Sequence, residues 1–388
     1  MEYRKHQWSI LGFGCMRFPR KGGAIDLEET QRELAYAIDH GITYFDTAYI
    51  YPGNEKALGE LVAKNHWRDR ICIATKMPHY LIKSIDGLEK LFQEQLQRLQ
   101  TDYVDNYLMH MLPDVHIWEK LIRMGILDWI REKKESGQIR KIGFSYHGNT
   151  ENFIKLLDAY DWEFCQVQYN YMDEFSQAGR AGVEHAASKG IPVIIMEPLR
   201  GGRLVNNLPP KAMQVFEKAE PKRSPAEWGL RWLWDQSGVS VVLSGMNSMD
   251  MVQENIRIAE QVKAGELTEQ DMELYAQVRA AINEKVKIPC TGCGYCQPCP
   301  FGVDIPGAFR SYNVSYTDNF FTAEREYFMC TTLRAETTRV TQCKKCGKCE
   351  KHCPQGIHIR DELDNVKKRL ENPVYRVVAS VAKLLSKK

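Results

Sequence analysis

Residues 43–76 read TYFDTAYIYPGNEKALGELVAKNHWRDRICIATK. A short apolar run (43–48) is followed by an amphipathic stretch (about 54–65) and then by a second short apolar run (71–76). Two such runs joined by a segment of helix length indicate parallel strands with a crossover helix between them. This strand–helix–strand unit therefore predicts an α/β fold for the part of the chain around it.

The same alternation continues in both directions along the chain. We expect eight strands, at 9–15, 43–48, 71–76, 104–110, 141–146, 164–169, 192–197 and 239–245. The stretches between them have apolar residues three and four positions apart, which is typical of one helix face; they cover 27–40, 54–65, 84–100, 120–136, 150–160, 177–189, 224–236 and 249–263. Eight such units predict a (β/α)₈ TIM barrel. A doubly wound open sheet is the alternative, but no G-x-G-x-x-G motif follows an early strand.

Eight of the twelve cysteines lie in two runs, CTGCGYCQPCP (290–300) and CKKCGKCEKHCP (343–354). In each run three cysteines are two residues apart and a fourth precedes a proline, which is the ligand pattern of iron–sulfur proteins. Eight thiolates predict two [4Fe–4S] clusters, while a zinc site and disulfides are weaker alternatives.

The fourth cysteine of each run is expected to serve the other cluster, as it does in two-cluster ferredoxins. One cluster then takes Cys290, Cys293, Cys296 and Cys353, and the other takes Cys343, Cys346, Cys349 and Cys299. The first run has two residues before its last cysteine where three are usual, so it stays open whether Cys299 takes part in this exchange. Cys330 lies between the runs and is expected to be a bystander.

These patterns divide the chain into four parts. We expect the barrel over 1–265, a connecting helix over 266–287, a small, mostly helical ferredoxin-like iron–sulfur domain over 288–372 and an amphipathic tail helix over 373–388. The tail has one apolar stripe, which predicts packing on the barrel or on a second subunit rather than on a membrane surface; it consists of Val374, Val377, Val378, Val381, Leu384 and Leu385.

The overall composition excludes some classes of function. A net charge of +2 gives no electrostatic basis for binding nucleic acid. No apolar run approaches the roughly eighteen residues that a membrane span needs. The chain starts MEYRKHQW, without an apolar signal core, so we expect it in the cytoplasm. The sequence predicts no particular oligomeric state.

Polar residues end several of the expected strands. Asp46, Lys76 and His110 end the second, third and fourth strands, and Tyr51 follows Asp46 by five residues. Each alone suits an ordinary structural role, but together they converge on the end of the barrel where TIM-barrel chemistry takes place. These groups suit carbonyl reduction. The phenol donates a proton, the ammonium lowers the pKa of the phenol, the acid holds the ammonium in place, and the imidazole orients the carbonyl oxygen.

These four residues and the motif D-T-A-x-x-Y (46–51) resemble the aldo/keto reductase family. The segment M-E-P-L-R-G-G (196–202) and the start C-T-G-C-G-Y-C (290–296) resemble its ferredoxin-fused subgroup. The resemblance implies a catalytic tetrad at Asp46, Tyr51, Lys76 and His110. It also implies NAD(P)H bound in extended form on the barrel, a small carbonyl or alcohol substrate and a redox partner protein for the clusters.

The nicotinamide cradle departs from the pattern of that family. The resemblance places the cofactor contacts at Ser145, Gln166, Met196, Pro198, Leu199, Gly201, Gly245 and Asn255. Tyr146 replaces the usual asparagine after the serine, and Met196 replaces the tyrosine that stacks on nicotinamide. Gly245 and Met251 stand where NADP-using members carry cations, and Arg257 is the nearest cation. The sequence therefore predicts NAD preference or weak nicotinamide binding.

The alternative function is that of an electron-transfer or assembly protein. Its reductase-like barrel would no longer use nicotinamide efficiently, and its clusters would be relays or structural elements. Two loops are expected to cover the mouth: a lid over 110–121 and an irregular excursion over 201–223. His79, Tyr80 and Trp118 are expected either to cover the barrel top or to line the substrate pocket.

Overall fold

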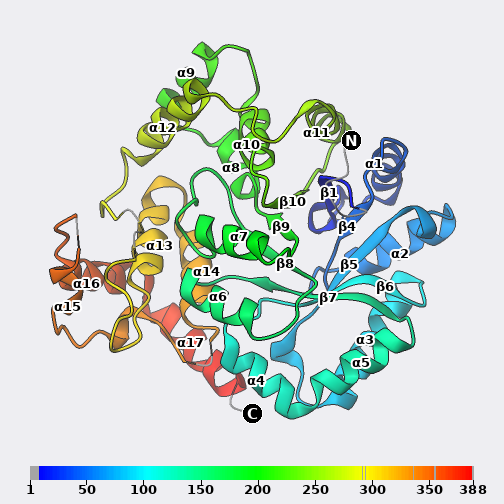
Figure 1. Cartoon of the computed structure of the whole chain (residues 1–388), viewed down its shortest axis with the longest axis horizontal. Helices are drawn as coiled ribbons and strands as arrows, with labels where there is room; N and C mark the ends of the chain where they lie inside the picture. The colour runs from blue at the N-terminus through cyan, green and yellow to red at the C-terminus, as the bar shows by residue number, and fades with distance from the viewer. Residues whose placement is uncertain (1–7, 291, 293, 335, 354, 387–388) are drawn as a thin grey trace.

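The computed structural model describes residues 8–386, apart from 291, 293, 335 and 354. Eight parallel strands close into a barrel in the order β1-β10-β9-β8-β7-β6-β5-β4 (Figure 1). They are β1 (Leu11–Gly14), β4 (Tyr44–Asp46), β5 (Cys72–Met77), β6 (Val104–Met109), β7 (Ile139–Tyr146), β8 (Phe164–Gln168), β9 (Val193–Met196) and β10 (Val239–Ser244). The predicted (β/α)₈ barrel is confirmed. A short antiparallel pair, β2 (Arg20–Lys21) and β3 (Ala24–Ile25), follows β1.

Helices surround the barrel and begin where the sequence supplies caps. The Ser84 side chain accepts a hydrogen bond from Gly87 N at 3.1 Å and starts α3, and Asp26 starts α1 in the same way. The helices on the barrel are α1 (Leu27–Asp39), α2 (Asn54–Lys64), α3 (Ile85–Leu99), α4 (Val115–Met124), α5 (Ile126–Glu135), α6 (Thr150–Asp158), α7 (Gly179–Ser188), α10 (Pro225–Trp234) and α11 (Met249–Gln261).

Three expectations about connecting segments are refined by the structure. The single helix expected over 120–136 is split into α4 and α5, because Gly125 has a left-handed φ of 104° that interrupts the helix. The excursion over 201–223 contains α8 (Arg203–Asn206) and α9 (Pro210–Lys218), and a proline in the first turn is compatible with a helix start. Most of the expected lid over 110–121 is the beginning of α4.

Trp118, on α4, does not line a substrate pocket. Its ring is fully buried, with its centroid 4.7 Å from that of Trp162 and 5.2 Å from that of Tyr160. The bottom of the barrel is closed in a similar manner by Trp8, which packs edge-on against Tyr44 and Phe164. An apolar layer therefore closes one end of the barrel, which leaves the carboxyl ends of the strands as the open mouth.

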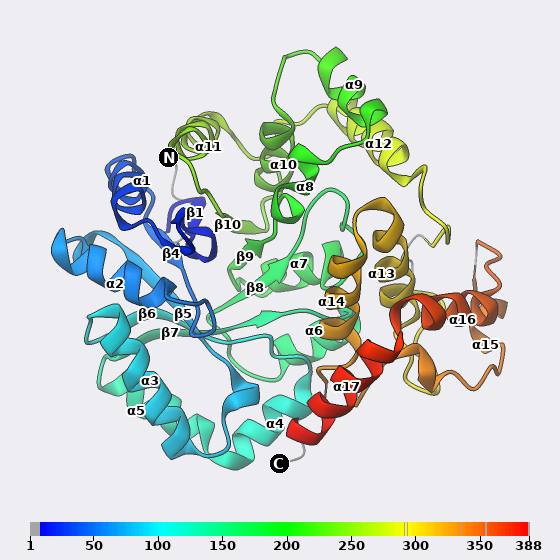
Figure 2. The same cartoon turned by 180° about the vertical axis from the view of Figure 1, so that it is seen from behind.

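The C-terminal region lies against one side of the barrel and has a hydrophobic core of its own, which includes Phe309, Tyr327 and Leu363 (Figures 1 and 2). After α12 (Glu269–Asn283) come α13 (Ile305–Thr317), α14 (Phe320–Thr331), α15 (Lys348–Lys351), α16 (Ile359–Leu370) and α17 (Pro373–Ser386). The mostly helical character expected of this domain is seen between the cysteine runs in α13 and α14, which are separated where the Asn319 side chain caps α14. Short 3₁₀ turns lie at η1 (Cys15–Arg17), η2 (Arg68–Arg70), η3 (His79–Leu81), η4 (Arg200–Gly202) and η5 (Val340–Gln342).

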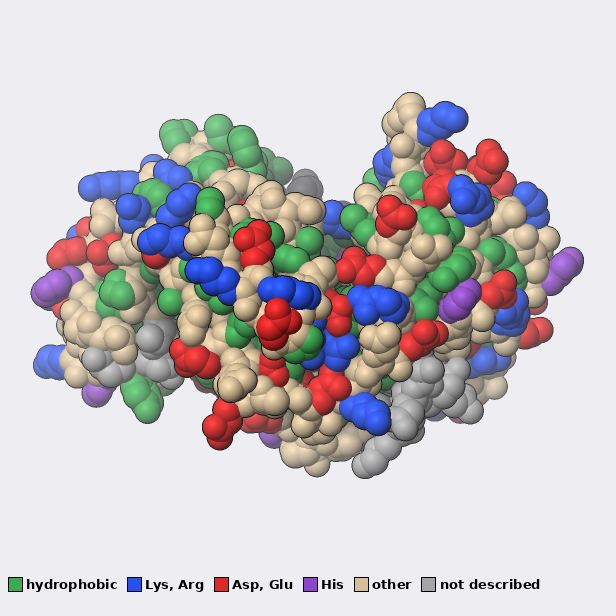
Figure 3. Space-filling model, turned by 90° about the horizontal axis from the view of Figure 1, so that it is seen from above, with side chains coloured by type: hydrophobic (Ala, Val, Ile, Leu, Met, Phe, Trp, Pro, Cys, Tyr) green, Lys and Arg blue, Asp and Glu red, His purple; other side chains and the backbone are tan. Residues whose placement is uncertain are grey.

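Within the chain, the tail helix α17 packs through a face other than the expected stripe; Leu384 and Leu385 of that stripe lie outside the residues whose side chains are described, and packing on a second subunit stays a prediction. Tyr375 and Ala379 are buried, whereas the valine stripe faces outward, with Val374 70% exposed. None of the helices in the described part of the chain combines the length and apolar character needed to cross a bilayer. On the face seen in Figure 3, acidic and basic side chains are interspersed.

Candidate active site and cluster domain

A buried ion pair lies at the mouth of the barrel. Lys76 at the end of β5 donates a hydrogen bond from Nζ to Asp46 Oδ2 at 2.6 Å and another to the Thr47 carbonyl oxygen at 2.7 Å. Both side chains are almost fully buried. Burial lowers the pKa of Lys76, but the Asp46 carboxylate opposes burial and that pKa is raised overall. The ammonium is therefore held charged, as the sequence predicts.

Tyr51 lies beside this ion pair, with Lys76 Nζ 5.3 Å from its ring centroid. Burial raises the pKa of the Tyr51 phenol, and the Lys76 charge opposes that rise without cancelling it. The expected lowering by lysine is present, yet desolvation is the larger effect. Tyr51 is therefore a protonated phenol at neutral pH.

His110 completes the group. Its ring lies edge-on to the Tyr51 ring, with centroids 6.2 Å apart. Burial and then the Lys76 charge lower the pKa of His110 well below its usual value, so the imidazole is neutral. Its Nδ1 is buried without a hydrogen-bond partner among the described residues. The structure thus brings all four predicted tetrad residues together at one mouth.

Ser145, expected to contact nicotinamide, holds the loop that carries His110. Its Oγ accepts a hydrogen bond from Met111 N at 2.8 Å, and its carbonyl oxygen accepts one from Leu112 N at 2.9 Å. The next residue, Tyr146, is fully buried and donates to the Asn149 carbonyl oxygen at 2.7 Å. Tyr146 therefore does not supply the amide that its position usually provides in the family.

Gln166, on β8, has an unsatisfied acceptor. Its Nε2 lies 3.7 Å from Met196 Sδ, and its Oε1 is buried without a hydrogen-bond partner in the described structure. An orphaned amide oxygen at the mouth suits a ligand that brings an N–H, such as a carboxamide. Pro198 is buried after Met196, and Leu199 is partly buried.

The residues expected at the adenosine end lie on β10 and α11. Gly245 is exposed just after β10, and the buried Asn255 donates from Nδ2 to Ser244 Oγ at 2.9 Å. Arg257, the nearest cation in sequence, donates from Nη2 to Glu227 Oε2 at 2.7 Å. The structure therefore directs Arg257 to a carboxylate of α10.

The loop after β9, which carries Gly201, adopts an unusual backbone. Glu197, Arg200, Gly201 and Gly202 all have positive φ, between 47° and 90°. Left-handed φ is costly for residues other than glycine and persists where the surroundings fix it. Here Arg200 Nε donates to Asp173 Oδ2 at 2.9 Å.

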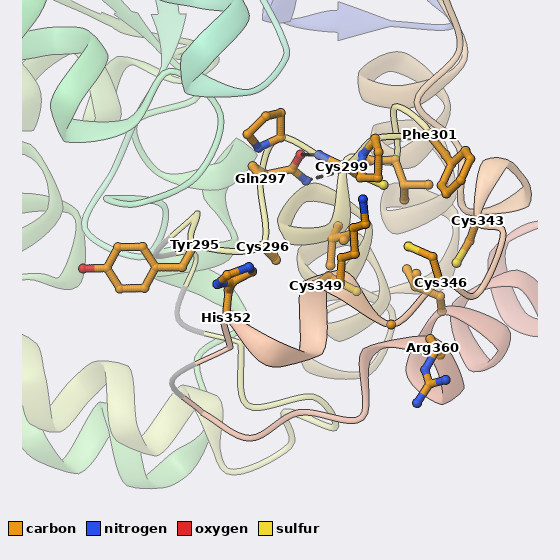
Figure 4. Close-up of a pocket in the computed structure, with 17 residues that line it drawn as sticks. Tyr295, Cys296, Gln297, Cys299, Phe301, Cys343, Cys346, Cys349, His352 and Arg360 are labelled. Atoms are coloured by element: carbon orange, nitrogen blue, oxygen red, sulfur yellow. Dashed lines mark hydrogen bonds between the residues drawn. The ribbon is translucent and has the colours of Figure 1, made fainter.

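The cysteine runs border two cavities. One, of about 400 Å³, is lined by Cys296, Cys299, Cys343, Cys346 and Cys349. In Figure 4, Cys299, Cys343, Cys346 and Cys349 group toward one side, away from Cys296. Lys345 N donates to Cys343 Sγ at 3.3 Å. The first three thiols of the second run and the last thiol of the first run thus line one cavity together with Cys296.

The other cavity is lined by Cys290, Cys296 and Cys353 together with Ile305 and Phe309. These are the described members of the quartet expected for the first cluster, and Cys293 lies outside the described residues. Cys330 is buried on α14 and lines neither cavity. The described side chains include no group of three or more His, Cys, Asp or Glu residues arranged around a single metal ion.

Two arginines of the cluster domain bind the barrel near its mouth, and neither was predicted. Arg334 donates to the Pro113 carbonyl oxygen at 3.0 Å and to the His147 carbonyl oxygen at 3.1 Å. Arg310, on α13, donates to Asp173 at 2.9 Å. A buried aspartate after a barrel strand was the only available signal, and its partner lies 137 residues away.

Comparison with known proteins now adds to this geometry. Residues 10–279 match the model of the aldo/keto reductase family, and residues 289–358 match that of a 4Fe-4S dicluster domain. L-galactose dehydrogenase of Arabidopsis thaliana is 27% identical over 315 residues, which cover 72% of this chain and 92% of that protein. The Schizosaccharomyces pombe aldo-keto reductase yakc is 28% identical over 206 residues, which cover 50% of this chain and 59% of that protein.

Solved structures share the barrel. An aldo-keto reductase from Klebsiella pneumoniae in complex with NADPH superposes with a TM-score of 0.58 at 22% identity, covering 70% of this chain and 91% of its own. The holo form of AKR11C1 from Bacillus halodurans superposes with a TM-score of 0.57 at 22% identity, covering 69% and 91%. With its barrel and dicluster matches end to end, this chain belongs to the aldo/keto reductase family and carries a 4Fe-4S ferredoxin domain after the barrel.

Proposed function

We propose that the barrel interconverts a small carbonyl compound and its alcohol, with Tyr51 as the proton donor. The observation that carries the proposal is the buried Lys76–Asp46 pair beside a neutral His110 and a protonated Tyr51. These are the groups that an alkoxide formed at the mouth would require.

The residues would act in a fixed order in the direction of reduction. The neutral His110 imidazole donates a hydrogen bond to the substrate oxygen and orients it. Tyr51 then donates its proton to that oxygen, and the Lys76 ammonium stabilises the phenolate that remains. Asp46 holds Lys76 charged and in place through its 2.6 Å hydrogen bond. In the direction of oxidation, the Tyr51 phenolate accepts the proton.

The nicotinamide cofactor would be held by the residues around Gln166, whose free Oε1 fits a carboxamide N–H. When bound, NAD(P)H supplies the hydride. That the Klebsiella pneumoniae relative was solved with NADPH supports this class of cofactor. Pro198, Leu199, Gly201, Gly245 and Asn255 would line the rest of its path.

Two [4Fe–4S] clusters would be held by the two cysteine quartets of the domain over 288–372. Each supplies one-electron transfer when present. Cys343, Cys346, Cys349 and Cys299 border one cavity, which supports an exchange of the fourth ligand between the runs. Through these clusters the protein would exchange electrons with a redox partner.

Binding and catalysis are tested separately. Anaerobic titration with NADH and NADPH, followed by protein fluorescence, should give saturable binding of at least one nucleotide. Tyr51→Phe should lower the rate of carbonyl reduction by about 100-fold or more and leave nucleotide affinity unchanged. Tyr80→Phe is the control, since Tyr80 is an exposed tyrosine near the same mouth.

The second candidate is an electron-transfer or assembly protein whose barrel no longer uses nicotinamide efficiently. Two hydrogen bonds favour it: Ser145 Oγ accepts from Met111 N, and the Tyr146 hydroxyl donates to the Asn149 carbonyl oxygen. Both groups are therefore engaged within the protein at positions expected to contact nicotinamide. If neither nucleotide binds, the first candidate is excluded and this one remains. If Tyr51→Phe reduces carbonyls at the rate of the unmodified protein, the assignment of Tyr51 is wrong.

A further inference from the structure

Arg17 lies in η1, directly after β1, at the mouth of the barrel. Two residues earlier, Cys15 is buried within electrostatic reach of Asp46 and Lys76. In the barrel register Gly14 pairs with Asp46. Arg17 is therefore an exposed cation carried by the strand next to the proposed tetrad.

The side chain of Arg17 crosses two glycines that belong to different loops. A Cβ on Gly245, after β10, would lie 2.7 Å from Arg17 Cδ. A Cβ on Gly201, after β9, would lie 2.7 Å from Arg17 Nη2. Both distances are shorter than real Cβ contacts, so in the observed conformation the Arg17 side chain lies directly against both glycines. The glycines thus form a cradle for the arginine.

The guanidinium of Arg17 has no ion pair or hydrogen bond with any residue that the structure describes. Other arginines near the mouth donate hydrogen bonds within the protein: Arg200 to Asp173, Arg257 to Glu227, and Arg20 to the carbonyl oxygens of Gly23 and Pro52. A positioned guanidinium without an anionic partner matches the geometry of a phosphate, which it binds through two parallel N–H groups.

We infer that Arg17 binds the diphosphate of the dinucleotide at the barrel mouth. The inference rests on the proposed nicotinamide function. Arg17 supplies a cation at the mouth where Gly245 and Met251 do not. Because the diphosphate is common to NAD and NADP, this contact favours neither cofactor over the other.

The test compares Arg17→Ala with Arg20→Ala by isothermal titration calorimetry of the anaerobic full-length protein. Arg17→Ala should weaken NADH and NADPH to the same extent, by about 10- to 100-fold, as expected for a hydrogen-bonded charge pair. Arg20→Ala removes an equal charge three residues away and should leave both affinities unchanged. Arg17→Lys should recover part of the loss, since lysine keeps the charge without the planar fork.

A double-mutant cycle tests the cradle itself. Gly245→Ala should displace the Arg17 side chain and weaken binding in the unmodified protein, but should have little further effect when Arg17 is already alanine. If Gly245→Ala weakens nucleotide binding equally in the unmodified protein and in the Arg17→Ala variant, Gly245 does not act through the Arg17 side chain and the cradle is overturned.

Each remaining outcome is decisive. A loss confined to NADPH would overturn the diphosphate assignment and place the 2′-phosphate on Arg17. Unchanged affinity for both nucleotides in Arg17→Ala would overturn the inference while the proposed function stands. If the unmodified protein binds neither nucleotide, the proposed function and this inference both fail.

Discussion

Arg310 Nε on α13 donates a hydrogen bond to Asp173 Oδ1 of the barrel at 2.9 Å. The same carboxylate accepts from Arg200, which lies in the loop after β9. Burial would raise the pKa of Asp173, but the two guanidinium groups outweigh burial and hold that pKa well below its usual value. One buried carboxylate therefore ties the cluster domain to the loop that carries Gly201.

Asp173→Asn should destabilise the whole protein. It removes the buried charge that pairs with the partly buried guanidinium groups of Arg200 and Arg310, and breaking a buried ion pair typically costs about 3–5 kcal/mol. We expect a clear fall in the midpoint of anaerobic thermal unfolding, with barrel and cluster signals lost together. Asp128→Asn is the control, because Asp128 is 77% exposed. Equal midpoints for the two variants would show that the Asp173 network contributes no stability.

The pH dependence of the two reaction directions should differ. Burial raises the pKa of Tyr51, so the phenol stays protonated and the rate of carbonyl reduction should be flat from pH 6 to pH 9. Alcohol oxidation requires the phenolate and should rise with pH over the same range. Lys76→Met should lower the reduction rate by about 100-fold or more, because the phenolate loses its cation. A reduction rate that falls steeply between pH 7 and pH 8 would contradict the raised pKa of Tyr51.

The exchange of fourth ligands between the cysteine runs predicts which variants lose which cluster. Cys353→Ala should remove the first cluster and Cys299→Ala the second, each lowering the iron content from about eight to about four per chain. The electron paramagnetic resonance signals that survive should differ between these variants. Cys330→Ala is the control and should retain both clusters. If Cys299→Ala and Cys290→Ala lose the same signal, the fourth ligands are not exchanged.

Glu33, on α1, should make stability depend on pH. Both of its carboxylate oxygens are buried and lack a hydrogen-bond partner in the described structure, and burial raises its pKa from 4.5 to about 7. The contribution of Glu33 to the free energy of unfolding is most favourable below pH 4.5, where the carboxyl is protonated in both states, and is lost as the pH rises through 7. Glu33→Gln should therefore stabilise the protein at pH 8, by up to about 3 kcal/mol, and by less at pH 6. Thermal unfolding at the two pH values measures this, with the exposed Glu28→Gln as control; an equal gain at both pH values would contradict the prediction.

The surface around the second cysteine run should favour an acidic redox partner. Cys346 is exposed, and Lys344, Lys348 and Lys351 around it are exposed without an ion pair among the described residues. Lys344→Glu together with Lys348→Glu should slow reduction of the clusters by an acidic one-electron carrier about 10-fold at low salt, because electrostatic steering is lost. Stopped-flow measurements should show this difference disappearing at high salt. Lys64→Glu, on α2, should have no effect, and an equal effect there would point to net charge alone.

The sequence was sufficient for the barrel because its signals are local. Each strand is a short apolar run, and Asp46, Lys76 and His110 mark strand ends, so closing the barrel brings them together. The unpredicted features depend on tertiary contacts. Arg334 reaches carbonyl oxygens more than 180 residues away in the chain. The course of Arg17 depends on Gly201 and Gly245, which become its neighbours only when the barrel closes. For α17, periodicity identified an apolar stripe but not its partner, and the valines of that stripe do not pack on the barrel.

The Arg334 contacts bear on how this protein can be divided. The guanidinium donates hydrogen bonds to the carbonyl oxygens of Pro113 and His147, two residues in separate loops of the barrel. A gene cut before residue 288 would encode a barrel in which those carbonyls have lost the Arg334 guanidinium and the Asp173 carboxylate keeps Arg200 but has lost Arg310. A chimera that joins this cluster domain to a single-domain reductase would need an acceptor for Arg334 and a carboxylate for Arg310. The two parts are thus exchangeable only as a matched pair.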